Sequence, residues 1–243
     1  YHEGIDKARA VLCQAQPGES GWLAPADAQR VLSALGIAGV ETRTAASEEG
    51  AVVAAAALGY PVALKGVGPA IVHKTDAGAV HLDLGDDDAV RAAYRGMAAR
   101  LGAAMTGVLL QRMAPAGVEM FIGGLQDPVF GPVVFAGSGG VLVELFGDAA
   151  CRLCPATDRD VDEMLGEMRG SVRLRGYRGA APADEAAYRD AILRVAALLD
   201  ACPEILEMDI NPLTVGESGV CALDLRIRVG EPLRPRASRR VRY

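Results

Sequence analysis

The stretch PVALKGVGPAIVHK, from Pro61 to Lys74, combines an apolar run, two lysines and a glycine loop. Its first residues, PVALK, predict a strand that ends at Lys65. The glycines that follow let backbone N–H groups come close to an anion, and a lysine supplies a compact positive charge for a phosphate oxygen. The stretch therefore predicts a phosphate-covering loop, although a plain turn after a strand has the same local pattern.

The rarity of lysine in the chain supports the prediction of a phosphate-covering loop. Of the 25 Lys and Arg residues only three are Lys, and two of them, Lys65 and Lys74, flank the loop. His73, one of three histidines, lies directly before Lys74. A histidine beside phosphate-binding groups can accept a phosphoryl group or carry a proton, whereas a lone histidine is commonly a surface residue. His73 is therefore a candidate nucleophile.

A second polar pattern lies near the end of the chain, in EMDINPL (Glu207–Leu213) and ALDLRI (Ala222–Ile227). Asp209 and Asn211 occupy alternate strand positions and so share one face. If the two segments form a hairpin, Asn211 and Asp224 converge as oxygen ligands of the kind that Mg²⁺ prefers. A polar strand edge has the same spacing and stays an alternative.

The strand GVLLQRM (Gly107–Met113) ends just before a turn, and Glu119 follows on the next predicted strand. Such a crossing can offer backbone groups to the edge of an adenine and a carboxylate to a ribose. The backbone groups in question belong to Gln111, Arg112 and Met113.

Periodicity and turn residues divide the chain into two unequal α/β lobes. Helices are predicted over 25–35, 47–58, 86–101, 158–168 and 182–201, and strands over 61–65, 79–84, 107–113, 117–123, 132–135, 141–145, 205–210 and 220–225. We expect a leading segment (1–21), a small lobe with the phosphate-covering loop (22–109), a large lobe with the metal site (110–230) and a basic tail (231–243). Clefts between lobes commonly bind small ligands.

Composition limits the function class. With 51% hydrophobic and 23% charged residues the chain is typical of globular proteins, and its net charge of -6 predicts no binding of nucleic acid. The most apolar run, 131–146, is broken by glycines and contains Glu144, so we expect no membrane span. Five cysteines, an odd number, favour a reducing compartment and a cytoplasmic location. Because the chain begins with Tyr1, we interpret it as a fragment.

Together these strings resemble the ATP-grasp domain of NDP-forming acyl-CoA synthetases, relatives of the succinyl-CoA synthetase beta subunit. The matching runs are GYPVALKGVGPAIVHKTDAGAV, GVEMFIGGLQDPVFGPVVFAGSGGVLVELFGD, RLRGYRG, and EMDINPL with ALDLRI. They span about residues 22 to 230 in the family's order. The resemblance implies an ATP-grasp fold with the nucleotide cleft between the two lobes.

The resemblance also implies a role for each candidate residue. Lys65 corresponds to the lysine that holds nucleotide phosphates, and 111–113 to the hinge whose backbone meets adenine. Glu119 corresponds to an acidic residue of the nucleotide pocket. The metal-site residues are Asn211 and Asp224, with Asp209 beside them. The implied cofactors are ATP or ADP and Mg²⁺.

His73 corresponds to the histidine that, in the ADP-forming acetyl-CoA synthetases, takes a phosphoryl group from a second, mobile histidine and passes it to ADP. The second histidine belongs to a CoA-binding half, which is either a separate subunit or a fused domain. We therefore expect the chain to carry the ATP end of an acid–thiol ligase. The intact enzyme would interconvert acyl-CoA, ADP and phosphate with carboxylic acid, CoA and ATP.

Two other functions stay open. The chain resembles a regulatory or scaffolding domain of a multidomain protein lysine acetyltransferase as well, because such fusions occur in the family. An ATP-grasp ligase that joins a carboxylate to an amine would share the lysine and the metal site but has no need for His73. A homo-oligomer is also possible.

Overall fold

The computed structural model describes residues 1–68, 78–114, 116–140 and 147–233 of the 243-residue chain. These residues form both helices and sheets, which confirms the predicted mixed α and β class. The chain divides into two compact units. We call them the large unit (Tyr1–Gly39 with Pro115–Tyr243) and the small unit (Val40–Ala114).

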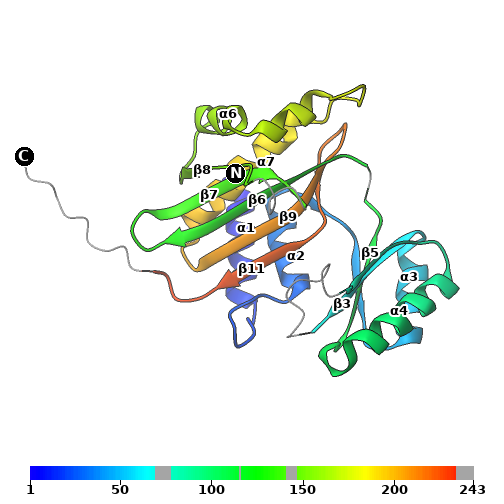
Figure 1. Ribbon diagram of the computed structural model, residues 1–243. Coiled ribbons are helices and arrows are strands. Elements are labelled where there is room, and N and C mark those ends of the chain that lie inside the picture. The colour runs from blue at the N-terminus through cyan, green and yellow to red at the C-terminus, as the bar shows by residue number, and fades with distance from the viewer. Residues whose placement is uncertain (69–77, 115, 141–146, 234–243) are drawn as a thin grey trace, which may run out of the picture. The chain divides into compact units, whose positions relative to one another are not determined.

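The large unit is built on a seven-stranded sheet with the strand order β1-β10-β9-β6-β7-β8, in which β11 also pairs with β9 (Figure 1). The strands are β1 (Ala38–Gly39), β6 (Val118–Asp127), β7 (Gly131–Ser138), β8 (Ala149–Leu153), β9 (Ile205–Val215), β10 (Val220–Ala222) and β11 (Leu225–Val229). All of these pairings are antiparallel except that of β1 with β10. The sheet thus places β6 beside β9 and β9 beside β11, although β6 lies far from the other two in the sequence.

Helices cover one face of this sheet, and in Figure 1 α1, α2 and α7 lie behind it. The helices of the unit are α1 (His2–Gln14), α2 (Pro25–Ala34), α6 (Asp158–Glu167) and α7 (Glu185–Ala201), with a 3-10 helix η2 (Arg169–Arg175). Met120 and Met208 of the sheet share one buried core with Ile192 of α7. Because successive strand residues point to opposite faces, Glu119 and Asp209 face away from these helices. We call that side the outer face of the sheet.

The small unit has a four-stranded antiparallel sheet with its own core. The strand order is β2-β5-β3-β4. Its elements are β2 (Thr42–Ala45), α3 (Glu48–Leu58), β3 (Val62–Val67), β4 (Val80–Leu84), α4 (Asp87–Leu101), the 3-10 helix η1 (Gly102–Ala104) and β5 (Gly107–Arg112). Leu64 and Leu110 pack with Met97 of α4 in a cluster separate from the core of the large unit. The small unit is therefore stabilised by its own buried surface.

Local signals set the ends of α2, α3 and α4 close to where the sequence predicts them, whereas α7 begins at Glu185, three residues later than predicted. The Ser47 hydroxyl accepts a hydrogen bond from the N–H of Gly50 at the start of α3, and the Asp86 carboxylate accepts one from Ala89 at the start of α4. Pro25 is the first residue of α2, where its missing N–H costs nothing. Gly59 and Gly102 follow the ends of α3 and α4 with positive φ, which glycine adopts readily.

The unit boundaries differ from the expected lobes 22–109 and 110–230. The reason is packing, because Val31 and Leu32 of α2 are fully buried in the core of the large unit. The leading segment, for which no helix was predicted, forms α1, and its Ile5 and Ala8 join the same core. The strand expected over 220–225 is in fact two strands, β10 and β11, which pair with different parts of β9. The strand expected over 141–145 lies outside the described residues.

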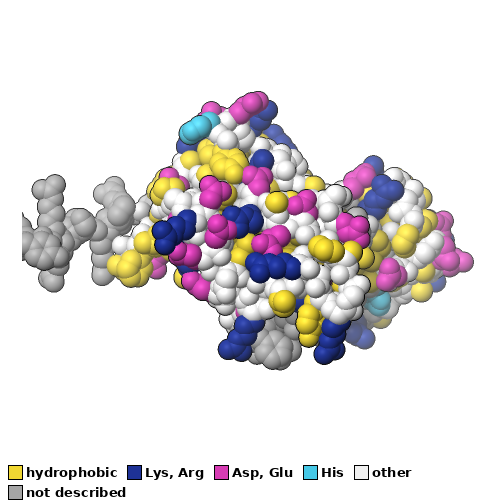
Figure 2. Space-filling view, turned by 90° about the horizontal axis from the view of Figure 1, so that it is seen from above, with side chains coloured by type: hydrophobic (Ala, Val, Ile, Leu, Met, Phe, Trp, Pro, Cys, Tyr) yellow, Lys and Arg dark blue, Asp and Glu magenta, His cyan; other side chains and the backbone are white. Residues whose placement is uncertain are grey.

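Charged side chains of both signs are interspersed on the face of the molecule that Figure 2 shows. Several ion pairs join helix α6 and its surroundings, since Arg152 lies within ion-pair distance of Glu163 and Glu167, and Arg159 pairs with Glu163. No helix in the described ranges has the length and hydropathy that a membrane crossing requires.

Candidate functional site

Lys65 lies near the end of β3, half-buried, on a sheet of the small unit. It pairs with Leu109 of β5 and Val80 of β4. The neighbouring residue Leu64 enters the core beneath α4, so Lys65 points away from that helix. Gly66 has a packing role of its own, because a Cβ there would lie 2.9 Å from the Sδ of Met97. The Lys65 side chain therefore stands on the sheet face opposite the helices.

The segment Gln111–Met113 ends β5 at the border between the two units, which falls after Ala114. Gln111 is buried, and its amide donates to the Thr42 hydroxyl at 3.3 Å. The N–H groups of Arg112 and Met113 donate to backbone carbonyls of the same unit, at 3.1 and 3.4 Å. The hinge role of this segment stays a prediction, and the N–H groups of Arg112 and Met113 already have partners within the small unit.

In the large unit, Asn211 and Asp224 lie directly opposite each other, as the predicted hairpin requires. The N–H of Asn211 donates to the carbonyl of Asp224 at 3.1 Å. The pairing of β9 with β6 changes register here, since Met120 faces Leu213 whereas Ile122 faces Ile210. One extra residue of β9 is thus accommodated as a bulge, a feature that often re-aims side chains beside functional sites.

The glycine-rich end of β7 comes to the same place. The side-chain oxygen of Asn211 accepts a hydrogen bond from the N–H of Gly140 at 3.2 Å. A Cβ at Gly140 would lie 2.5 Å from Oε2 of Glu119, and the φ of Gly140 is +66°. Gly139 donates to the carbonyl of Glu119 at 3.0 Å. The GSGG string thus lies between Glu119 and Asn211, and only glycine fits at position 140 without strain.

Asp209 shares the outer face with Asn211, two residues away. Burial raises the pKa of the Asp209 carboxyl to about 6, and the negative charge of Asp224 acts in the same direction, while Arg226 opposes it. The structure therefore places Glu119, Asp209, Asn211 and Asp224, together with Gly140, in one region that we call the polar cluster.

The polar cluster has the donor chemistry of a Mg²⁺ site. Its side chains offer carboxylate and amide oxygens, the hard ligands that Mg²⁺ takes together with water and substrate phosphates. The repulsion between Asp209 and Asp224 is the kind that a divalent cation relieves. Across the described ranges no group of three or more His, Cys, Asp or Glu side chains is arranged to hold a metal ion by itself. The residues fit an open site that is completed by a ligand.

His73 and Lys74 lie outside the described residues, so the structure neither supports nor opposes their proposed roles. The other predicted site residues are divided between the two units. Lys65 and 111–113 belong to the small unit, and the polar cluster belongs to the large unit.

Asp148 has a structural role that the sequence pattern does not predict. Its carboxylate accepts hydrogen bonds from the Ser138 hydroxyl at 2.6 Å and from the N–H groups of Arg169 and Gly170, both at 2.7 Å. Burial of Asp148 works against its charge, but these three hydrogen bonds outweigh burial and lower its pKa. Asp148 thus ties the start of η2 to the end of β7. Nothing in the sequence links it to Gly170, 22 residues away.

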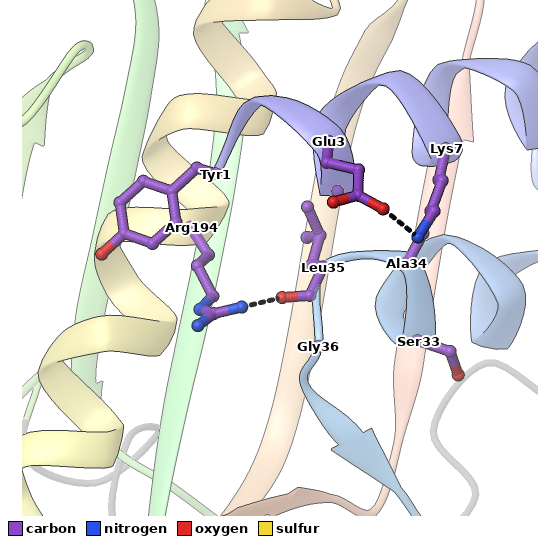
Figure 3. Close-up of a pocket in the computed structure, with 9 residues that line it drawn as sticks. Tyr1, Glu3, Lys7, Ser33, Ala34, Leu35, Gly36 and Arg194 are labelled. Carbon is purple, nitrogen blue, oxygen red and sulfur yellow. Dashed lines mark hydrogen bonds and ion pairs between the residues drawn. The ribbon is translucent and has the colours of Figure 1, made fainter.

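A cavity of ≈ 400 Å³ lies elsewhere in the large unit, between α1, the end of α2 and α7 (Figure 3). Its charged groups already have partners, because Arg194 donates to the carbonyl of Leu35 at 2.6 Å and Lys7 pairs with Glu3 at 2.7 Å. None of the predicted site residues lines it. We therefore assign the candidate site to the polar cluster.

Known proteins resemble this chain closely. It is 40% identical over 215 residues to an acetate–CoA ligase (ADP-forming) I of Archaeoglobus fulgidus, covering 87% of this chain but only 31% of that relative. It is 37% identical to the beta subunit of the corresponding Pyrococcus furiosus ligase, covering 92% of this chain and 98% of the subunit. A solved acetyl-coenzyme A synthetase of Ca. Korarchaeum cryptofilum superposes with a TM-score of 0.83 at 38% identity, over 92% of this chain and all of that one.

These likenesses confirm the fold that the sequence strings implied. A family model described as an ATP-grasp domain matches residues 14–229, which include Lys65, the segment 111–113 and the whole polar cluster. The chain therefore belongs to the ATP-grasp domain family.

Proposed function

We propose that this chain is the nucleotide-binding part of an ADP-forming acyl-CoA synthetase and that it binds ADP or ATP together with Mg²⁺. The observation that carries the proposal is the convergence of Glu119 and Asn211 on Gly140, with Asp224 hydrogen-bonded to Asn211, in a chain of the ATP-grasp family. One structure of a related Korarchaeum synthetase contains Mg-AMPPCP together with coenzyme A, which supports binding of a magnesium-bound adenine nucleotide here.

Each part of the chain has a distinct task in this proposal. Asp224 and Asn211 would hold the metal, with Asp209 beside them, and the bound Mg²⁺ would neutralise charge on the phosphate oxygens. Lys65 would add a point charge on the phosphates. Glu119 would accept a hydrogen bond from the ribose, and 111–113 would border the adenine. Phosphoryl transfer depends mainly on such alignment and charge neutralisation.

We further propose that His73 is the relay nucleophile. A neutral imidazole nitrogen attacks the phosphorus of a phosphohistidine on the partner half, the bond to the partner histidine breaks, and the phosphoryl group then passes to ADP. One Korarchaeum structure contains a phosphohistidine segment that points towards the nucleotide site, which supports such a relay.

The partner is expected to be the CoA-binding half, together with a small carboxylic acid and CoA. In the Archaeoglobus relative this chain corresponds to 31% of the length, whereas in Pyrococcus it corresponds to 98% of a separate beta subunit. Both fused and separate arrangements therefore occur among relatives. A cytoplasmic location and fusion to an acetyltransferase stay predictions.

Calorimetric titration of the 243-residue chain with ADP, with and without Mg²⁺, tests the nucleotide proposal. Asp224→Asn should weaken Mg-ADP binding at least about tenfold, because the lost carboxylate charge holds the metal. Asp200→Asn, at an exposed position on α7, is the matched control and should bind as the parent chain does. A folded parent chain that binds no ADP, or equal binding by Asp224→Asn, would contradict the proposal.

A further inference from the structure

Arg226 lies on the outer face of the sheet, next to the polar cluster. In the β9–β11 pairing it stands directly opposite Asp209. Asp224 lies two residues earlier in the chain, just before β11 begins. Arg226 is thus the cation that the fold places beside the proposed metal ligands.

An aromatic ring holds the Arg226 side chain. The guanidinium carbon of Arg226 lies 4.3 Å from the centre of the Trp22 ring, the geometry of a cation–π contact. Trp22 itself is fixed by its neighbours in the chain. Gly21 accepts a hydrogen bond from the N–H of Val229 at 2.9 Å, and Leu23 donates to Ile227 at 2.9 Å. The segment around Trp22 therefore lies along β11 and supports the arginine.

Arg228, the next outward-facing residue of β11, also lies over the Trp22 ring, 5.9 Å from its centre, but it pairs with a carboxylate. Its guanidinium donates to the Glu207 carboxylate at 3.0 and 3.1 Å, and only 37% of its side chain is exposed. Arg226 is exposed, and within the part of the chain that the structure describes it forms no ion pair with a carboxylate. The ring, rather than an acidic side chain, fixes its position, so its N–H donors can meet an anion.

We propose that Arg226 binds the phosphate groups of the nucleotide, and that Trp22 keeps it from pairing with Asp209. This inference rests on the proposed nucleotide binding and assigns one more residue to that site. An arginine presents a planar set of donors that suits phosphate oxygens. In this arrangement the carboxylates of the polar cluster bind Mg²⁺. Arg226 supplies a positive charge for the nucleotide phosphates that bind together with Mg²⁺.

This role has an electrostatic signature. Removing Arg226 removes a positive charge beside Asp209 and Asp224, so the site should hold a bare divalent cation as well as before, or more tightly. The same substitution should weaken the binding of any ligand that carries phosphate. If Arg226 were needed only for folding, its removal would weaken binding of the cation and of the phosphate ligand alike.

The test uses Arg226→Met in the 243-residue chain, with Arg228→Met as the matched control. The probes are ADP with Mg²⁺, adenosine, and Mn²⁺ alone, measured by calorimetry, NMR titration and paramagnetic resonance. For Arg226→Met we expect about a tenfold loss of Mg-ADP affinity, unchanged adenosine affinity, and Mn²⁺ affinity equal to or above that of the parent. Arg228→Met should keep Mg-ADP affinity within about threefold. Trp22→Leu should show a smaller loss for Mg-ADP, because the freed arginine turns towards Asp209.

Two results would overturn the inference while leaving the proposed function intact. One is a parent chain that binds Mg-ADP and an Arg226→Met variant that binds it equally well. The other is a loss in Arg226→Met that is as large for adenosine as for ADP. If the folded parent chain binds no ADP, the proposed function and this inference both fall.

Discussion

Asn211 shows how one residue can connect three strands. The bulge in β9 places its side chain against the N–H of Gly140, at the end of β7, and its own N–H against the carbonyl of Asp224, just before β11. A hydrogen bond to a neutral amide is worth roughly 1 kcal/mol, so this connection contributes modestly to stability. Its larger effect is to hold Asn211 beside Gly140 and the backbone of Asp224, so that these segments meet before any ligand arrives.

At the same scale, His73 is tested by substitution in the complete synthetase. His73→Ala should abolish turnover while ATP still binds, because the relay loses its nucleophile but the metal and phosphate ligands remain. His81→Ala, on β4, is the matched control and should turn over normally. Steady-state kinetics measure the loss of turnover, and titration with ATP measures whether the variant still binds the nucleotide. Normal turnover of His73→Ala would exclude the relay role.

At the scale of elements, η2 depends on Asp148. Two consecutive N–H groups at its start and the hydroxyl of Ser138 all donate to this one carboxylate. The N-cap residue Met168 offers no side-chain cap, so the start of η2 relies on this carboxylate, while Leu174 anchors the rest of η2 in the core. Asp148 therefore fixes how the start of η2 meets the end of β7.

The pKa of Asp148 gives this contact a pH dependence. Because the folded-state pKa lies below the unfolded value, the carboxylate stabilises the fold above the unfolded pKa, and the contribution is lost as pH falls through the folded pKa. Asp148→Asn should therefore lower the free energy of unfolding by about 1 kcal/mol at pH 7, a value reduced for its solvent exposure. The difference from the parent should shrink near pH 3. Urea unfolding at both pH values measures it, with Asp200→Asn as control, and a pH-independent difference would contradict the assignment.

At the scale of the whole molecule, the two units have separate cores. Leu64 is fully buried in the small unit and Ile122 in the large unit, and the two belong to different clusters. Neither core shares a buried residue with the other. The units can therefore respond separately to damage.

A reciprocal pair of substitutions tests this independence. Leu64→Ala should cost about 2–5 kcal/mol in the small unit, and Ile122→Ala a similar amount in the large unit. Hydrogen exchange should speed up in β3 and β5 for the first variant and in β6 and β9 for the second. Equal loss of protection in both units from either variant would mean that the chain unfolds as one cooperative body.

The sequence by itself determined what depends on neighbouring residues. Ser47 and Asp86 predict the starts of α3 and α4, because a helix cap acts within one turn. The alternation of Asp209 and Asn211 predicts that they share one face, because strand geometry is local. The motif strings also identified the family, which the match over residues 14–229 confirms.

Tertiary structure decided what depends on residues far apart in the chain. The apolar stripe of α2 suits any core of the right shape, and only packing assigned Val31 and Leu32 to the large unit rather than to the lobe that follows them in sequence. The contacts of Asp148 with Gly170 and of Trp22 with Arg226 likewise join residues whose spacing carries no periodic signal. Local preferences act over a few residues, whereas these pairings form only when the sheet brings distant segments together.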